Sequence, residues 1–165
     1  MWKLPKKLVW GLIRMEKYLL NLLGEYRVCA ELLRRGLFAT ITYGNKKGAD
    51  IYVVGEEKKV AVVEVKASQS KKFVTGFYQK YKSPNVDHPD FWVLAAMSES
   101  RDRFFVLTHE EMERTQCKRN CPGEDLGWEE AAIRSTNGVD NVLLPSVIDH
   151  EDRWDKIARH VRASL

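Results

Sequence analysis

Apolar residues recur at helical spacing early in the chain. Residues 15–35 repeat them every three or four positions and are followed by Gly36, which predicts one helix with a C-terminal stop. Its predicted inward stripe consists of Leu19, Leu22, Leu23, Tyr26, Cys29, Ala30 and Leu33. Residues 37–43 then alternate apolar and polar positions, which predicts a first strand.

Shorter apolar runs follow this first strand. Residues 51–54 and 59–66 predict two strands, and the second is apolar on both faces, as in a central strand covered on both sides. Residues 91–97 and 104–107 predict two more strands. Helices are expected at 73–81, after the N-cap Thr108, and at 149–161 with Trp154, Ile157 and Val161 inward. Residues 127–145 receive no firm assignment beyond a helical turn at 128–134.

Charged residues interrupt this pattern at two strand ends. Asp50 begins one apolar run, and Glu64 and Lys66 end the next. Side chains two apart in a strand share a face, so Glu64 and Lys66 project together. Asp50 joins them if residues 51–54 and 59–66 form a hairpin with an odd loop, for example three residues at 55–57, or with a bulge. An even loop would put Asp50 on the other face.

Two carboxylates and an ammonium group at strand ends suit divalent-cation chemistry. Mg²⁺ prefers carboxylate oxygens and keeps several waters, which leaves positions for a phosphate oxygen. The lysine can orient a water or neutralise charge on a phosphoryl group. Phosphodiester hydrolysis is the reaction that fits this set. The competing interpretation is an ordinary solvated strand end, since short motif matches are frequent by chance.

Two glutamates of the first helix compete for a role at such a site. Glu25 lies about 80° from the centre of the predicted stripe, at the border of the buried face. Glu31 lies about 160° away, with Arg34 and Arg35 within four residues, which indicates a solvated salt-bridge partner. Only Glu25 is placed to reach a site beneath the helix. The alternative interpretation is that Glu25 lies at the border of the buried face and extends its carboxylate into water.

Length and cysteine content indicate a single intracellular domain. The chain has 165 residues, of which 44% are apolar, enough for one core. Three cysteines fit a reducing compartment, and Cys117 and Cys121 with His109 lack a fourth ligand at a zinc spacing. The apolar run at residues 8–13 is too short for a signal peptide or a membrane span. We therefore expect a soluble protein that does not enter membranes.

Basic residues concentrate in the half that holds the carboxylates. Residues 1–82 carry 17 Lys and Arg against 7 Asp and Glu, whereas residues 83–165 carry 10 against 16. A positive field there favours a polyanionic partner, with nucleic acid the first candidate; solvated surface lysines explain it equally well. The substrate-binding candidates are Lys46, Lys47, Lys71, Lys72 and Gln79.

The order of elements and acids resembles the PD-(D/E)XK nuclease superfamily. Gly48-Ala49-Asp50 resembles its PD element with Ala for the common Pro, and Glu64-Val65-Lys66 matches its (D/E)XK element. Glu25 matches the acidic residue of its first core helix, and the spacing to Gly36 is similar to that of archaeal Holliday junction resolvases. The resemblance covers about residues 15–107 of a single domain and leaves an acidic helical extension at about 108–165.

This resemblance implies a restriction-endonuclease-like α/β core, a central mixed β-sheet flanked by helices. It further implies Mg²⁺ or Mn²⁺ bound by Asp50 and Glu64, Lys66 as a catalytic lysine, and Glu25 assisting. The expected activity is a DNA endonuclease of the restriction, repair or recombination type, with a homodimer left open. The alternative is a nucleic-acid-binding or protein-interaction module that keeps the fold without catalysis. A third reading is a regulatory protein that docks a partner through residues 128–165.

Overall fold

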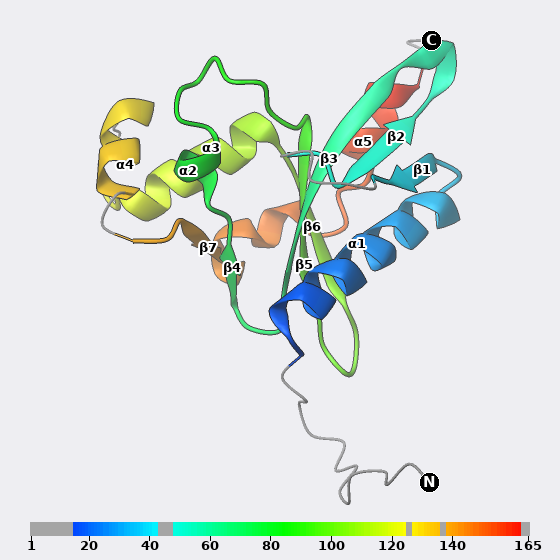
Figure 1. Ribbon diagram of the computed structural model, residues 1–165, viewed down its shortest axis with the longest axis horizontal. Helices are drawn as coiled ribbons and strands as arrows, with labels where there is room; N and C mark the ends of the chain where they lie inside the picture. Colours follow the sequence, from blue (N-terminus) through cyan, green and yellow to red (C-terminus); the bar gives the residue numbers. More distant parts are fainter. Residues whose placement is uncertain (1–14, 43–47, 125–126, 136–137, 163–165) are drawn as a thin grey trace, which may run out of the picture.

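A five-stranded mixed sheet forms the centre of the molecule (Figure 1). The computed structural model describes residues 15–42, 48–124, 127–135 and 138–162. Within them the strand order is β1-β2-β3-β5-β6, with β3 and β5 parallel and the other neighbours antiparallel. The strands are β1 (Phe38–Ile41), β2 (Ile51–Val54), β3 (Val60–Ser68), β5 (Phe91–Ala96) and β6 (Arg103–Thr108). The expected α/β fold with a central mixed sheet flanked by helices is confirmed.

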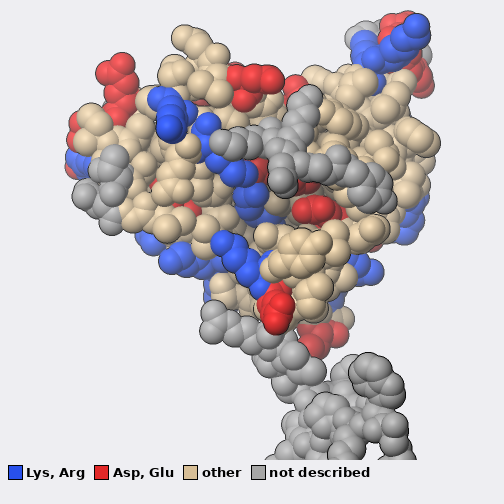
Figure 2. Space-filling model, in the orientation of Figure 1, with Lys and Arg blue, Asp and Glu red and all other residues tan. Residues whose placement is uncertain are grey.

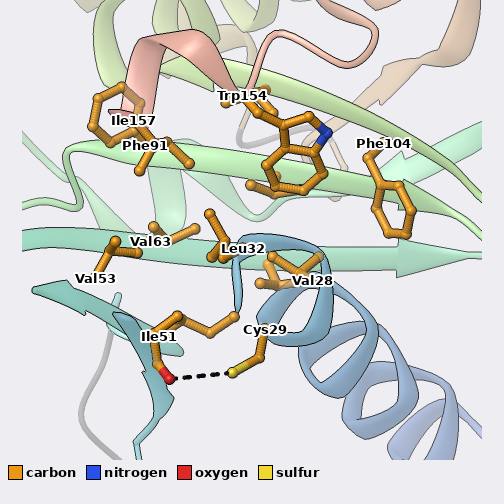
Figure 3. Packing of buried hydrophobic residues seen from close by; sticks show 14 of the residues in the cluster. Val28, Cys29, Leu32, Ile51, Val53, Val63, Phe91, Phe104, Trp154 and Ile157 are labelled. Carbon is orange, nitrogen blue, oxygen red and sulfur yellow. Dashed lines mark hydrogen bonds between the residues drawn. The ribbon is translucent and has the colours of Figure 1, made fainter. Parts of the chain in front are cut away.

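One face of the sheet is covered by apolar contacts from both ends of the chain. α1 (Lys17–Arg34) and α5 (Asp155–Val161) pack there, as Figure 1 shows. Figure 3 shows Val28 and Leu32 of α1 facing the strands, with Trp154 and Ile157 from the C-terminal segment on the same core. Cys29 lies in this core and its thiol donates to the Ala39 carbonyl. Burial of these side chains holds the two ends of the chain on one layer.

The other face carries a second apolar core under shorter elements. These are β4 (Lys72–Val74), α2 (Phe77–Lys80), α3 (His109–Asn120), α4 (Trp128–Ser135), β7 (Asn141–Leu143) and the 3₁₀ helix η2 (Leu144–His150). β4 and β7 form a separate two-stranded sheet. Phe77, Trp92 and Met112 are fully buried at the centre of this core. A further 3₁₀ turn, η1 (Glu56–Lys58), connects β2 to β3.

The outer edge of β6 is contacted by a later segment of the chain, at Glu151 and Asp152. Glu151 forms an isolated bridge with Phe105, and the Asp152 N–H donates to the Phe104 carbonyl at 2.8 Å. The chain thereby passes from the second core to the first, where Trp154 is buried. Pairing of this edge removes a site where another strand could add. The α-helix expected at 149–161 begins only at Asp155, because residues up to His150 belong to η2 and Glu151 and Asp152 bond to β6.

The inward stripe expected for the first helix is only partly correct, since Cys29 is buried and Leu23 packs on the core, while the helix and its stop at Gly36 are confirmed. Leu19, Tyr26 and Leu33 are about half exposed, at 49%, 51% and 50%. The buried positions are Gly24, Val28, Cys29 and Leu32. Gly24 lies at the contact itself, because a Cβ there would stand 2.6 Å from the Ala67 Cβ. Glycine has no side chain and adds nothing to a hydrophobic pattern, so this pattern did not reveal the contact face of α1.

The helix expected at residues 73–81 is also wrong over its first half. Phe73 lies in β4 and pairs with Val142 of β7, 69 positions later in the chain. Only Phe77–Lys80 is helical, after Gly76 at φ +59°. Partners this distant leave no local signal, and tertiary pairing overrides the propensity. The same pairing assigns residues 141–143, while the helical turn at 128–134 is confirmed as α4.

Candidate active site

Asp50 and Glu64 lie at the open end of the β2–β3 hairpin. Ile51 pairs with Val63 and Val54 with Val60, so five residues, 55–59, connect the strands. The loop is odd, as the site required, but it is two residues longer than the three-residue version, so Val54 does not face Lys58. The ladder ends at the Ile51–Val63 pair; Asp50 lies one residue before it in the chain, and Glu64 is the residue after Val63. Both carboxylates therefore belong to residues that flank the last ladder pair.

The Asp50 carboxylate takes the place of a strand partner. β2 begins at Ile51, so the Val65 N–H lies beyond the last ladder pair, and it donates to Asp50 Oδ2 at 2.7 Å. The Asp50 N–H in turn donates to the Val63 carbonyl at 3.0 Å. Burial raises the pKa of Asp50 and the Glu64 charge adds to this, while Lys66 and the Val65 N–H oppose it. Ionised Asp50 is thus held at an energetic cost.

Glu64 is fully buried and has three side-chain partners. Its Oε1 lies 2.6 Å from the Lys66 Nζ and also pairs with the Lys80 Nζ. Its Oε2 accepts a hydrogen bond from the Tyr81 hydroxyl at 2.7 Å. Burial alone would raise the pKa of Glu64, but the two ammonium groups lower it below its ordinary value. Glu64 therefore stays ionised inside the protein.

The two lysines on Glu64 differ in their surroundings. Burial opposes the charge of Lys66, yet the Glu64 carboxylate outweighs it and raises the pKa of Lys66. The pKa of Lys80 is lowered, first by burial and then by the charge of Lys66. The sequence analysis did not identify Lys80 or Tyr81 as partners of Glu64. The signal was the aromatic pattern around Phe77 and Tyr81, which docks α2 on the sheet.

An aromatic wall fixes Tyr81 against Glu64. The Tyr81 ring packs edge-on against Trp92 and His109, with centroids 5.9 and 5.0 Å apart. Trp92 Nε1 donates to His109 Nδ1 at 3.2 Å, and burial together with His88 lowers the pKa of His109 to about 4. His109 is therefore neutral near pH 7. Gly48, at φ +78°, leaves room for the phenol, because a Cβ there would stand 2.9 Å from the Tyr81 oxygen.

Glu25 approaches the site from the opposite layer. The close contact at Gly24 brings α1 onto β3 near Val65 and Ala67. Measured from the observed buried positions, Glu25 lies roughly 40° from the centre of the contact face, nearer than the expected stripe implied. Burial raises the pKa of Glu25, the Asp50 charge adds to this and Lys66 opposes it, so Glu25 shares the electrostatics of the site. Glu31 instead pairs with Arg34 and Arg35, as expected.

The donor set fits a hard divalent cation in part. In the described ranges, no three His, Cys, Asp or Glu side chains come together as a ready ligand group. Glu25 as a third ligand stays a prediction, and His109 with Cys117 and Cys121 forms no such group. Asp50 and Glu64, however, supply carboxylate oxygens on either side of the Val65 backbone, whose N–H donates to Asp50 and whose carbonyl accepts from the Lys66 Nζ at 3.3 Å. Oxygen ligands of this kind suit Mg²⁺ or Mn²⁺.

Three of the five expected substrate-binding residues lie in the described part of the chain, and all three are at the surface. Lys71, Lys72 and Gln79 are exposed, with Lys72 at the start of β4 and Gln79 on α2. Lys46 and Lys47 lie outside the described residues. Figure 2 shows Lys and Arg atoms gathered over the middle of one face beside Asp and Glu atoms.

The described helices contain none long and apolar enough to cross a membrane.

Comparison with known proteins gives a structural match only. No protein-family model and no curated protein sequence matches the chain. The solved structure of a bacterial homing endonuclease, I-Ssp6803I, superposes with a TM-score of 0.53 and 14% sequence identity. The match covers 87% of this chain and 92% of that one. This chain shares the fold of a nuclease. At that identity the likeness concerns the fold, and the site must be argued from its own residues.

Proposed function

We propose that the protein is a divalent-cation-dependent nuclease of the PD-(D/E)XK type, which hydrolyses phosphodiester bonds in DNA as an endonuclease. The observation that carries this proposal is the meeting of two carboxylates and a lysine at β3: Asp50 accepts the Val65 N–H, the neighbouring Glu64 pairs with Lys66, and the Glu64 charge contributes to the raised pKa of Asp50. The shared fold with a homing endonuclease supports it. A single intracellular domain and a nucleic acid partner belong to the same proposal.

Asp50 and Glu64 would hold the cation, Mg²⁺ or Mn²⁺. When bound, such an ion supplies Lewis-acid polarisation of a phosphoryl oxygen and a more acidic water. Asp50 favours cation binding, because a nearby positive charge offsets the free-energy cost of ionising a buried carboxylate. Lys66 is fixed on the strand next to these acids, where its ammonium group can neutralise charge that develops on the phosphoryl oxygens.

Glu25 and the basic residues would complete the site. Glu25 carries a raised pKa beside Asp50 and can accept a proton from, or orient, a water between α1 and β3. Lys71 and Lys72, together with Lys46 and Lys47 and the amide of Gln79, would contact the nucleic acid backbone. One such site cuts one strand, so cleavage of both strands in one event would require a homodimer.

The second candidate is a nucleic-acid-binding module that has lost catalysis. One observation favours it: Glu64 is already neutralised by Lys66, Lys80 and Tyr81. A carboxylate so well paired gains less from a cation. Binding of nucleic acid without any response to divalent cations would support this second reading.

A cleavage assay tests the proposal. Single-stranded, duplex, flapped and branched DNA and matched RNA are incubated with Mg²⁺, Mn²⁺ or EDTA. We expect cation-dependent cleavage that Asp50→Asn abolishes and Asp149→Asn, an exposed aspartate outside the site, preserves. Equal cleavage by wild type and Asp50→Asn, or cleavage in EDTA, would contradict the proposal.

A further inference from the structure

The two lysines on Glu64 are held very differently. Lys66 lies in the nine-residue central strand β3, its Nζ donates to the Val65 carbonyl at 3.3 Å, and its side chain is 20% exposed. Lys80 is the last residue of the four-residue helix α2, and its side chain is 33% exposed. In the described part of the chain, Lys80 has no acceptor other than Glu64. Lys80 can therefore leave Glu64 by rotation of its own side chain, whereas Lys66 is fixed by the sheet.

The charges of the site balance only when a substrate phosphate is counted. With its side chains ionised, the site has three carboxylates, Glu25, Asp50 and Glu64, against the two ammonium groups of Lys66 and Lys80. A divalent cation turns the remaining negative charge into a positive one. One phosphodiester then restores neutrality. Charge left unbalanced in a buried site is costly, so the site with its cation favours one phosphate group.

We propose that Lys80 is a positioning residue that exchanges partners during the reaction: it neutralises Glu64 before a cation binds and afterwards contacts a phosphate of the nucleic acid. The proposal rests on the nuclease function proposed above and concerns how the same site selects its substrate. The cation and the Lys80 ammonium group compete for Glu64 Oε1. Lys66 remains beside Glu64 and Asp50 throughout.

The partly exposed side chain of Lys80, 33% accessible, makes a phosphate its natural second partner. α2 lies at the surface of the second core, and the neighbouring residues Gln79 and Lys82 are exposed. Tyr81 is anchored on Glu64 and the aromatic wall, which keeps α2 in place while the Lys80 side chain moves. A lysine on a flexible stem suits a phosphate oxygen as a point charge.

The first test measures cation binding without nucleic acid. Mn²⁺ is titrated calorimetrically into wild type, Lys80→Met, Lys80→Arg and Lys82→Met, the last being an exposed lysine that does not contact Glu64. Lys80→Met should bind Mn²⁺ about tenfold tighter or more, because a competing positive charge is gone. Lys80→Arg and Lys82→Met should stay near the wild-type affinity. Unchanged or weaker Mn²⁺ binding by Lys80→Met would overturn the exchange.

The second test measures cleavage kinetics at saturating Mn²⁺. Lys80→Met should raise KM for the nucleic acid about tenfold, one lost phosphate contact, and Lys80→Arg should recover most of it. If wild type cleaves but Lys80→Met behaves like Lys82→Met in both tests, the proposed role of Lys80 is overturned. The nuclease assignment would then still stand. Wild type that neither binds Mn²⁺ nor cleaves would remove the nuclease assignment and this inference with it.

Discussion

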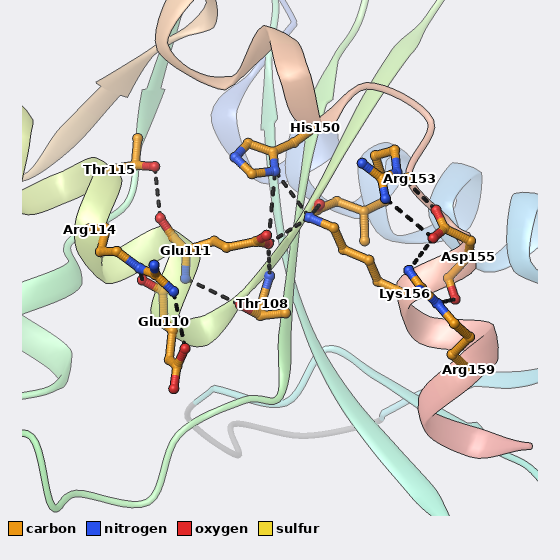
Figure 4. A network of polar contacts seen from close by, with 11 residues as sticks. Thr108, Glu110, Glu111, Arg114, Thr115, His150, Arg153, Asp155, Lys156 and Arg159 are labelled. Carbon is orange, nitrogen blue, oxygen red and sulfur yellow. Dashed lines mark hydrogen bonds and ion pairs between the residues drawn. The ribbon is translucent and has the colours of Figure 1, made fainter. Parts of the chain in front are cut away.

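Two carboxylates of this protein, Glu64 and Glu111, each accept a lysine ammonium group at 2.6 Å, yet they serve different ends. Glu111 Oε2 also accepts the Thr108 N–H at 2.8 Å, while the Thr108 hydroxyl accepts the Glu111 N–H, which closes a capping box at the start of α3 (Figure 4). Lys156 links this cap to β6, because its Nζ also donates to the Val106 carbonyl at 3.1 Å. Every partner of Glu111 stabilises local structure.

Among the residues that the structure describes, no backbone group donates to the Glu64 carboxylate. Its side chain pairs with two lysines and a phenol, and Asp50 stands beside it with a raised pKa. One lysine, with no second acid nearby, would be enough for a stabilising ion pair. Two lysines and a neighbouring carboxylate therefore cost more desolvation free energy than a structural role would need. The comparison shows that a partly buried ion pair which caps a helix is structural, whereas several like charges gathered around a buried residue of the central strand indicate chemistry.

The largest expected difference between the two carboxylates is in cleavage. Glu64→Gln should reduce cation-dependent cleavage by about a hundredfold to a thousandfold, since it removes a cation ligand and the partner of Lys66. Glu111→Gln should stay within about threefold of wild type, because it changes only the cap and its ion pair. Single-turnover cleavage of the best DNA substrate measures both. Equal losses in the two variants would break the distinction.

The next prediction concerns the structural role of Glu111 in stability. Glu111→Ala should lower the free energy of unfolding by about 1–3 kcal/mol, through loss of the cap and of a partly buried charge-assisted bond. Glu110→Ala, an exposed neighbour on the same turn, serves as the control and should change little. Urea unfolding followed by circular dichroism provides the measurement. A loss no larger than that of Glu110→Ala would argue against the structural role of Glu111.

Asp50 predicts a pH dependence of definite sign. Its pKa is raised in the folded protein, so ionisation of Asp50 destabilises the fold, with no effect below the unfolded value of about 4 and the full effect above the folded pKa. Asp50→Asn, studied in EDTA, should therefore gain stability relative to wild type as pH rises from about 4 to 7. Urea midpoints of both proteins across this range measure the difference. If the stability of Asp50→Asn relative to wild type instead falls as pH rises, Asp50 does not carry a buried, uncompensated charge.

The smallest expected effect separates the two glutamates of α1. Glu31→Ala should leave cleavage unchanged and shift stability by about 0.5 kcal/mol or less, as for other surface ion pairs. Glu25→Ala should reduce cleavage about tenfold or more, since it removes a charge coupled to Asp50 and Lys66. The same cleavage assay compares them. A larger loss from Glu31→Ala than from Glu25→Ala would reverse the assignment.

Local pattern was sufficient for the parts of the molecule that depend on neighbouring residues. The α1 helix, the β5–β6 hairpin and the Thr108 cap follow from periodicity, turn residues and capping chemistry. The phase of Asp50 against Glu64 followed from strand alternation once an odd loop was required. The loop length itself depended on the η1 turn, which includes positive φ at Glu57 and Lys58 and gave no clear sequence signal.

Features that depend on distant partners were not predictable in this way. β4 exists because residues 141–143 pair with it, and the face of α1 is set by Gly24 against Ala67. Lys80 and Tyr81 reach Glu64 only because the aromatic residues of α2 dock on Trp92. One part of the site therefore lay in the β2–β3 motif, and the other part arose from tertiary packing.

Direct titration with Mn²⁺ tests the central claim, that Asp50 and Glu64 form one cation site. Calorimetry is performed on wild type, Asp50→Asn, Glu64→Gln and Asp149→Asn in the absence of nucleic acid. We expect one site per chain in wild type and Asp149→Asn, and at least about a tenfold weaker affinity in each site variant. Wild-type protein without a saturable site, or site variants that bind as tightly as wild type, would contradict the account.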